Sequence, residues 1–317
     1  MKIYVGIAGL GPSHRARLNS TLVGHEVIHG DELAGLERRP AAVAAAEVVF
    51  ANVPPAWLAA APGLRWVQLD SAGVDAYLGL NTNRPGAPVV LTNLRNFYGE
   101  AVAEAALAGI LAWYRQLPRL LAAQSESRWI KTEVEPDIGR LHGASVIILG
   151  AGAIGGAIAP LLRAFGCDVR FFARHSPVAT WHTLADLDAA LPAADLVIST
   201  LPHSPETVGL LDGARLARLK PTALLVNVGR GSTLDEVALV RALEAGRLAG
   251  AVLDVTAVEP LPVSSALWRH PRVLLTQHTG GRFPGETDAK ITRFLENFAR
   301  FSRGEVLPAA VDLSRGY

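Results

Sequence analysis

Residues 146–155 read Val-Ile-Ile-Leu-Gly-Ala-Gly-Ala-Ile-Gly, an apolar run that ends in the pattern Gly-x-Gly-x-x-Gly. The run has the composition of a buried strand, and residues 157–165 after the last glycine have that of a helix. In a dinucleotide-binding turn the first glycine allows the tight turn, the second lets the backbone approach a pyrophosphate, and the third lets the helix pack on the strand. Because both flanking elements are present, the stretch predicts a nucleotide site rather than a merely structural turn. Its predicted binding residues are Gly150, Gly152, Ala153, Ile154 and Gly155.

The composition is that of an enzyme with two domains rather than of a nucleic-acid or membrane protein. With 317 residues, 50% of them apolar, 19% charged and a net charge of +1, the chain gives no electrostatic reason to bind nucleic acid or an anionic membrane. The single cysteine, Cys167, excludes an internal disulfide and is expected to be a buried core residue. No apolar run reaches the roughly 18 residues of a membrane span, and the N-terminus lacks a signal-peptide pattern, so a cytoplasmic location is expected.

Strands and helices alternate along the chain in two blocks, which predicts an α/β protein with two parallel sheets. In the first block we expect strands at 3–7, 26–29, 48–51, 65–69 and 89–91, and in the second at 145–149, 168–172, 195–200, 223–228, 250–255 and 273–276. A helix expected at 286–301 would return to the first block. The predicted domains are therefore a discontinuous one, 1–96 with 286–317, and a dinucleotide-binding one, 97–285.

Two segments between the blocks carry separate expectations. Residues 100–117 are rich in alanine and predict a long helix that Pro118 ends. Because this helix is apolar around almost its whole circumference, we expect it to be buried, either between the domains or against another subunit. Residues 125–140 predict an extended loop, in which Trp129 either packs against its own loop or reaches a neighbouring active site.

A second glycine pair, Gly9 and Gly11, follows the first strand but does not predict a second dinucleotide turn. Pro12 interrupts the pattern, and His14 stands where the third glycine should be. The end of the second strand after the main turn bears on cofactor choice, since an acidic residue there would accept the ribose hydroxyls of NAD. This chain instead has Arg174, His175 and Ser176, which predict a site for a 2′-phosphate, unless Arg174 is only an exposed arginine. NADP(H) is therefore the preferred cofactor and NAD(H) the alternative.

Three ionisable residues follow the carboxyl ends of later strands, the edge at which open α/β sheets bind ligands. They are Arg230, Glu259 and His278. Protonated His278 can donate a proton to the carbonyl oxygen of a 2-keto acid as hydride reaches the carbon, Glu259 can hold the imidazole, and Arg230 can bind the substrate carboxylate. His203, just past the strand at 195–200, is the main rival of His278 as the acid.

Four motifs together resemble the D-2-hydroxyacid dehydrogenase family, namely residues 150–155, residues 227–231, residues 253–255 with Glu259-Pro260, and His278. Residues 265–271 and 314–317 are similar to its glyoxylate/hydroxypyruvate reductase branch. The resemblance covers nearly the whole chain. It implies a flavodoxin-like substrate domain and a doubly wound dinucleotide-binding domain with a cleft between them, and a homodimer built through the 100–117 helix and the 125–140 loop.

The same resemblance implies further site residues and the same catalytic set, Arg230, Glu259 and His278. Ala72, Gly73 and Val74 match the loop whose backbone amides hold the substrate carboxylate, together with Arg230 and His278. Asp254 matches a residue that contacts the nicotinamide amide. The other positions that match the cofactor site are Pro202, Thr207, Val228, Gly229 and Gly280. No metal is implied.

Several positions depart from the family pattern around the substrate. Gln277 replaces a common proline, Thr256 replaces a common aromatic residue, and residues 280–282, Gly-Gly-Arg, are unusual. Glu259 argues against formate dehydrogenase activity, because that branch has glutamine there. The resemblance implies reduction of glyoxylate or hydroxypyruvate to the D-2-hydroxy acid. Oxidation of 3-phosphoglycerate, with Arg95 or Arg282 as an added cation, and a non-catalytic dinucleotide-sensing protein remain alternatives.

Overall fold

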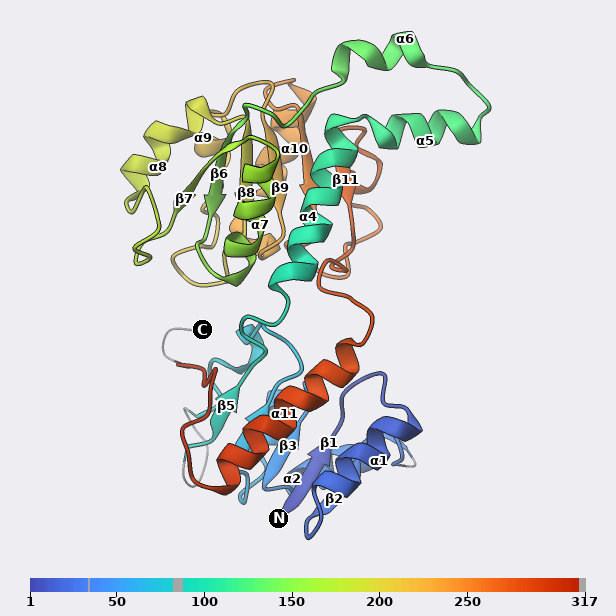
Figure 1. Ribbon diagram of the computed structural model, residues 1–317, viewed down its shortest axis with the longest axis vertical. Helices are drawn as coiled ribbons and strands as arrows, with labels where there is room; N and C mark the ends of the chain where they lie inside the picture. The colour runs from blue at the N-terminus through green and yellow to red at the C-terminus, as the bar shows by residue number, and fades with distance from the viewer. Residues whose placement is uncertain (34, 82–87, 314–317) are drawn as a thin grey trace. The chain divides into compact units, whose positions relative to one another are not determined.

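The computed structural model describes residues 1–33, 35–81 and 88–313, and the chain divides into two compact units (Figure 1). Unit 1 comprises Met1–Phe97 and Phe283–Tyr317, and unit 2 comprises Tyr98–Arg282. These bounds lie close to the expected 1–96 with 286–317 and 97–285, while the ligand that each domain binds stays a prediction. The motif at 314–317 lies outside the described residues.

Unit 1 is built on a five-stranded parallel sheet with the order β2-β1-β3-β4-β5, which is the flavodoxin-like order. The strands are β1 (Lys2–Val5), β2 (Glu26–His29), β3 (Val48–Phe50), β4 (Trp66–Gln68) and β5 (Val90–Thr92). Its helical segments are α1 (Pro12–Thr21), η1 (Leu36–Arg38), α2 (Arg39–Ala44), α3 (Pro55–Ala59), η2 (Asp75–Tyr77) and α11 (Glu286–Ser302).

The last helix, α11, belongs to unit 1 because its aromatic side chains complete that core. The Phe294 ring stacks on Phe50 at 4.4 Å and on Trp66 at 5.4 Å between centroids. All three side chains are fully buried, so the C-terminal helix covers one face of a sheet made from the first hundred residues (Figure 1). The expected return of the chain to its first domain is what the structure shows.

Unit 2 is built on a six-stranded parallel sheet with the order β11-β10-β9-β8-β6-β7. The strands are β6 (Ser145–Leu149), β7 (Asp168–Phe172), β8 (Leu196–Ser199), β9 (Leu224–Asn227), β10 (Gly250–Leu253) and β11 (Val273–Leu275). The chain leaves β6 toward β7 on one side and continues from β8 toward β11 on the other. This reversal between β6 and β8 is the switch point at which doubly wound sheets bind ligands.

The helical segments of unit 2 cover both faces of this sheet, whose inner strands β8, β9 and β10 are buried along their whole length. They are α4 (Gly99–Tyr114), α5 (Leu117–Ser125), α6 (Lys131–Val134), η3 (Glu135–Asp137), α7 (Ala153–Ala164), α8 (Leu184–Ala190), η4 (Leu191–Ala193), α9 (Gly213–Leu216), η5 (Gly231–Thr233), α10 (Glu236–Glu244) and η6 (Ala266–Arg269). No helix among the described residues is long and apolar enough to cross a membrane.

The expected 100–117 helix and 125–140 loop need correction. The first helix ends at Tyr114, and Pro118 lies in the first turn of α5 rather than ending α4. Helix α4 buries one face against α7 and β10 of its own unit, while Glu104 and Ala108 are exposed, so it is not buried all round. The 125–140 segment contains α6 and η3 instead of an extended loop.

Candidate active site

The glycine turn after β6 has the local geometry that a pyrophosphate site requires. Gly150 has φ +103°, and a Cβ there would lie 2.6 Å from Thr200 Oγ1. A Cβ at Gly155 would clash with the carbonyl oxygen of Gly150, so this glycine lets α7 pack on the strand. Gly152 differs, since a Cβ there meets nothing within 4 Å, and it caps α7 without a side-chain acceptor. The first-turn N–H groups of α7, at Ala153 and Ile154, thus face an open approach that fits a dinucleotide phosphate.

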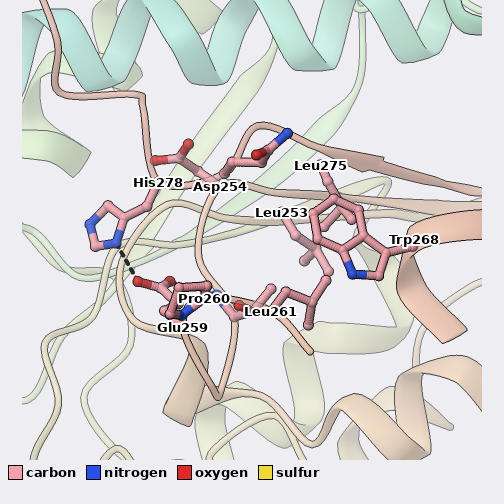
Figure 2. Close-up of a pocket in the computed structure, with 10 residues that line it drawn as sticks. Leu253, Asp254, Glu259, Pro260, Leu261, Trp268, Leu275 and His278 are labelled. Atoms are coloured by element: carbon pink, nitrogen blue, oxygen red, sulfur yellow. Dashed lines mark hydrogen bonds and ion pairs between the residues drawn. The ribbon is translucent and has the colours of Figure 1, made fainter. Parts of the chain in front are cut away.

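His278 and Glu259 are brought together although they are 19 residues apart in sequence. His278 Nδ1 lies 2.6 Å from Glu259 Oε2, and Figure 2 shows the two side chains facing one another. A carboxylate can only accept this hydrogen bond, so the proton sits on Nδ1 and Nε2 is left to point away from Glu259. The side chains are 51% and 36% exposed, so a reactant can reach them from solvent.

A cavity of about 510 Å³ lies beside this pair. Its polar wall carries His278, Glu259, Asp254, Thr256 and Gln277, and its apolar wall carries Leu253, Pro260, Leu261, Trp268 and Leu275 (Figure 2). Apolar lining with a few convergent polar groups is typical of small-molecule sites. Among the described histidines, His278 is the one that lines this cavity, whereas the rival His203 hydrogen bonds through Nδ1 to Ser232 Oγ at 2.8 Å.

Asp254, at the end of β10, holds the turn that carries His278. Its Oδ1 accepts hydrogen bonds from Thr276 Oγ1 at 2.7 Å, from the Thr279 N–H at 3.0 Å and from the Gly280 N–H at 3.2 Å. Its backbone oxygen accepts the His278 N–H at 2.5 Å. His278 and Gln277 both have φ +56°, a left-handed conformation that costs free energy for non-glycine residues. The buried Asp254 carboxylate therefore positions His278, a role additional to the nicotinamide contact that the resemblance implies.

Glu259 is fixed by its own loop and faces a second carboxylate. Its Oε1 accepts the Thr256 N–H at 2.9 Å, while the neighbouring Ala257 N–H donates to Glu236 Oε1 at 2.6 Å. The pKa of Glu236 is raised above its ordinary value, mainly by burial. The hydrogen bond from Ala257 lowers this pKa, and the nearby Glu259 charge raises it. Glu236 therefore anchors the 256–259 loop from the start of α10.

Arg230 stands on the adjoining loop, after β9, and its guanidinium donates to the Gly229 carbonyl at 2.9 Å. Its own carbonyl accepts from Asn227 Nδ2 at 3.0 Å and Thr233 Oγ1 at 2.8 Å. Gly231 packs so closely on Thr256 that a Cβ there would clash with the backbone, which joins this loop to the loop of Glu259. The structure thus pairs His278 with Glu259 and places Arg230 one loop away, outside the lining of the cavity.

The remaining predicted cofactor residues follow β7, β8 and β9. Arg174 Nη1 forms an ion pair with Glu206 Oε2 at 2.9 Å, and His175 is exposed beside it, with Ser176 half-buried. Thr207 Oγ1 donates to the Pro202 carbonyl at 2.6 Å and so closes the turn after β8. Buried Val228 and Gly229 continue the chain from β9, and Gly229 packs against the Leu201 backbone.

The predicted substrate loop belongs to unit 1 and follows β4. Asn93 Nδ2 donates to the Ala72 carbonyl at 2.7 Å, and Ser71 Oγ donates to the Gly73 carbonyl at 2.8 Å. Val74 is buried and anchors the end of the loop. These bonds occupy carbonyl groups of the loop and so give it a fixed shape.

Two side chains of these sites, and one role of a third, were not predicted from the sequence. Glu206 lies between two positions already matched to the cofactor segment, Pro202 and Thr207, and this neighbourhood is the signal that could have found it. Glu236 is the first residue of α10 and does not directly follow a strand. The expectation that site residues follow the carboxyl ends of strands therefore does not select it. The role of Asp254 in holding the His278 turn depends on backbone N–H directions that have no sequence signal.

The chain is similar to known proteins over most of its length. The model of the family described as D-isomer specific 2-hydroxyacid dehydrogenase, NAD binding domain, matches residues 107–280. Glyoxylate/hydroxypyruvate reductase A of Escherichia fergusonii is 36% identical over 273 residues, which cover 83% of this chain and 85% of the relative.

Two solved structures share the whole architecture. One is an NADPH-dependent glyoxylate/hydroxypyruvate reductase from Sinorhizobium meliloti in complex with NADP and sulfate, with a TM-score of 0.83 and 28% identity, covering 100% of this chain and 99% of that one. The other is a D-isomer specific 2-hydroxyacid dehydrogenase from Xanthobacter autotrophicus in complex with NADPH, with a TM-score of 0.80, 31% identity and the same coverage.

Proposed function

The chain belongs to the D-isomer specific 2-hydroxyacid dehydrogenase family, and we propose that it reduces a small 2-keto acid, glyoxylate or hydroxypyruvate, to the D-2-hydroxy acid with NADP(H) as the preferred cofactor. The observation that carries the proposal is the His278–Glu259 hydrogen bond of 2.6 Å beside a cavity at the edge of the sheet that bears the glycine turn. Hydride transfer coupled to protonation needs a dinucleotide turn and a proton donor. The six-stranded sheet of unit 2 holds both the glycine turn and the His278–Glu259 pair.

The chemistry of this chain is the protonation of the developing alkoxide. A reduced nicotinamide, when bound, supplies the hydride. His278 delivers the proton from Nε2, because Nδ1 is committed to Glu259. The Glu259 carboxylate stabilises the imidazolium before transfer and keeps the ring in the orientation that presents Nε2.

Substrate orientation is assigned to Arg230 and to the loop of Ala72, Gly73 and Val74. A guanidinium offers a planar fork that matches a carboxylate, and backbone N–H groups of a fixed loop give a second anchor. Support for Arg230 comes from the hydrogen bonds that fix its backbone carbonyl. The cavity of about 510 Å³ has room for a substrate of this size.

The cofactor site is assigned to Gly150, Gly152, Ala153, Ile154 and Gly155 for the pyrophosphate and to Arg174, His175 and Ser176 for the 2′-phosphate. The similar structures from Sinorhizobium meliloti and Xanthobacter autotrophicus were solved with NADP and NADPH, respectively. The segments after β8 and β9, with Pro202, Thr207, Val228 and Gly229, and the turn with Asp254 and Gly280 are assigned to the rest of the dinucleotide.

The experiment is a steady-state panel with both reduced cofactors. We expect turnover of glyoxylate and hydroxypyruvate, with kcat/KM for NADPH above that for NADH by about 10- to 100-fold, as an arginine–phosphate bond of about 1.5–3 kcal/mol implies. Phosphohydroxypyruvate as the best substrate would favour the 3-phosphoglycerate alternative. Dinucleotide binding without turnover of any 2-keto acid would favour the sensing protein.

We also propose that two copies of the chain associate through α4, α5 and the 125–140 segment. In support, Trp129 is 90% exposed, so it does not pack within its own loop, and Leu121 on α5 is also exposed. In light-scattering measurements we expect a dimer that Leu121→Asp dissociates. The matched control Val23→Asp, at an exposed position of unit 1, should leave the dimer intact, and a monomeric wild type would refute the proposal.

A further inference from the structure

The ion pair between Arg174 and Glu206 crosses the mouth of the glycine turn. Arg174 follows β7 and Glu206 follows β8, and these two strands flank β6 in the sheet. A bond of 2.9 Å between their side chains therefore spans the carboxyl end of β6, from which the Gly150–Gly155 turn emerges. The residue after the second strand of such a domain meets the 2′-position of the adenosine ribose. Glu206 thus binds the Arg174 guanidinium, the group that a 2′-phosphate would need.

The position of Glu206 is set by a turn that closes on itself. Thr207 Oγ1 accepts the Ser204 N–H at 2.9 Å and donates to the Pro202 carbonyl at 2.6 Å. The Thr207 and Val208 N–H groups both donate to the Ser204 carbonyl at 3.0 Å. The hydrogen bonds of this turn fix the backbone position of Glu206. The Arg174 side chain must therefore extend toward β8 to form the ion pair.

We propose that Glu206 is a cofactor-selectivity residue, which holds Arg174 when no 2′-phosphate is present and thereby lowers the preference for NADP(H) over NAD(H). The proposal rests on the proposed function, because it concerns the cofactor of that reaction. Binding of a 2′-phosphate to Arg174 must first break this ion pair, whereas a free 2′-hydroxyl leaves the pair in place. Glu206 therefore disfavours one cofactor and tolerates the other.

The size of the effect follows from the exposure of the pair. Arg174 is 37% and Glu206 is 63% exposed, so solvent screens their attraction. A screened ion pair of this kind limits the change in selectivity to about two- to fivefold, which corresponds to about 0.4–1 kcal/mol. Removal of Arg174 has a larger effect than removal of Glu206, because Arg174 makes the direct bond to the phosphate.

The test measures the binding of nucleotides that represent the adenosine half of the cofactor, so it does not depend on turnover. The dissociation constants of 2′,5′-ADP and 5′-AMP are measured by calorimetry, and those of NADPH and NADH by fluorescence titration, for wild type and Glu206→Gln. The proposal predicts that Glu206→Gln tightens 2′,5′-ADP relative to 5′-AMP by about two- to fivefold, and NADPH relative to NADH by a similar factor. An unchanged or reduced ratio overturns it.

Two further variants separate the ion pair from a general charge effect. Asp168→Asn removes the same charge from another exposed ion pair, with Arg170, at the other end of β7, and should leave the ratio unchanged. In an Arg174→Ala background, Glu206→Gln should also leave the ratio unchanged, because there is no arginine to release. A rise in the ratio in either case overturns the proposal in favour of simple repulsion.

Failure of the two ideas can be told apart. A wild-type protein that binds neither dinucleotide overturns the proposed function and this inference with it. A protein that binds both dinucleotides, with a ratio that Glu206→Gln does not move, keeps the proposed function and overturns the inference alone.

Discussion

An added methyl group should have opposite effects at Gly155 and at Gly152, two glycines at the start of α7. At Gly155 a Cβ clashes with the Gly150 carbonyl oxygen and lies 3.1 Å from Ile148 Cγ2, so the helix must move from the strand. Overpacking of this kind costs about 1–3 kcal/mol, or about 2–10 °C in Tm for a unit of this size. At Gly152, with φ −84°, a Cβ meets no protein atom within 4 Å.

Gly152→Ala should change stability by less than about 1 kcal/mol, because the restriction of the unfolded chain by alanine offsets its lower preference for the N-cap position. Its methyl group instead occupies the approach that we assign to the pyrophosphate, and a clash of about 1–3 kcal/mol there weakens dinucleotide binding about tenfold or more. Gly156→Ala is the matched control, because its Cβ also meets open space but lies one position past the motif.

The assays are thermal unfolding and fluorescence titration with NADPH on all three variants. The reasoning predicts lost stability for Gly155→Ala, lost binding with intact stability for Gly152→Ala, and neither loss for Gly156→Ala. A Gly152→Ala protein that binds NADPH like wild type would show that the open side of Gly152 is not a phosphate approach.

Three further variants test the site and the fold. Glu259→Gln removes a charge-assisted bond to His278 of about 1.5–3 kcal/mol and should lower kcat about 10- to 100-fold at saturating substrate, so a loss under twofold would refute the pairing. Asp254→Asn replaces one acceptor oxygen with an NH2 donor that faces the N–H groups of the His278 turn, and it should lower kcat by a larger factor than it weakens NADPH binding; an unchanged kcat would count against its positioning role. Burial raises the pKa of Asp195, but bonds from Lys220 and the Ser145 N–H outweigh it, so the folded pKa is below the unfolded value. The stability from Asp195 is thus present above about pH 4 and lost as the pH falls through the folded pKa; urea unfolding should show Asp195→Asn less stable by about 1 kcal/mol at pH 7, a difference that disappears once the pH is below the folded pKa.

Much of the fold was predictable because buried parallel strands are continuous apolar runs. The expected bounds of β2, β6 and β7 agree with the structure. Strands β1 and β5 are shifted by one or two residues from the expected bounds, and the other strands are shorter than expected by one or two residues. The contact between Glu259 and His278 was also predictable, since β10 and β11 are adjacent and parallel and bring both loops to one edge.

The errors have identifiable physical causes. Pro118 ended a helix in the prediction, but a proline in a first turn is favourable, because its missing N–H has no partner there anyway. The break itself lies at Gln116, with φ +55°, a left-handed conformation that no sequence signal of a non-glycine residue reveals. The bond between Arg174 and Glu206 depends on the shape of the turn after β8, which side-chain hydrogen bonds decide.

The central claim is that His278, held by Glu259, is the proton donor to the substrate oxygen. The most direct measurement compares wild type with His278→Asn for kcat with glyoxylate and hydroxypyruvate and for the NADPH dissociation constant. We expect kcat to fall by about 10²- to 10⁴-fold, while the NADPH dissociation constant changes by less than about threefold. Turnover within about tenfold of wild type, with the cofactor still bound, would contradict it.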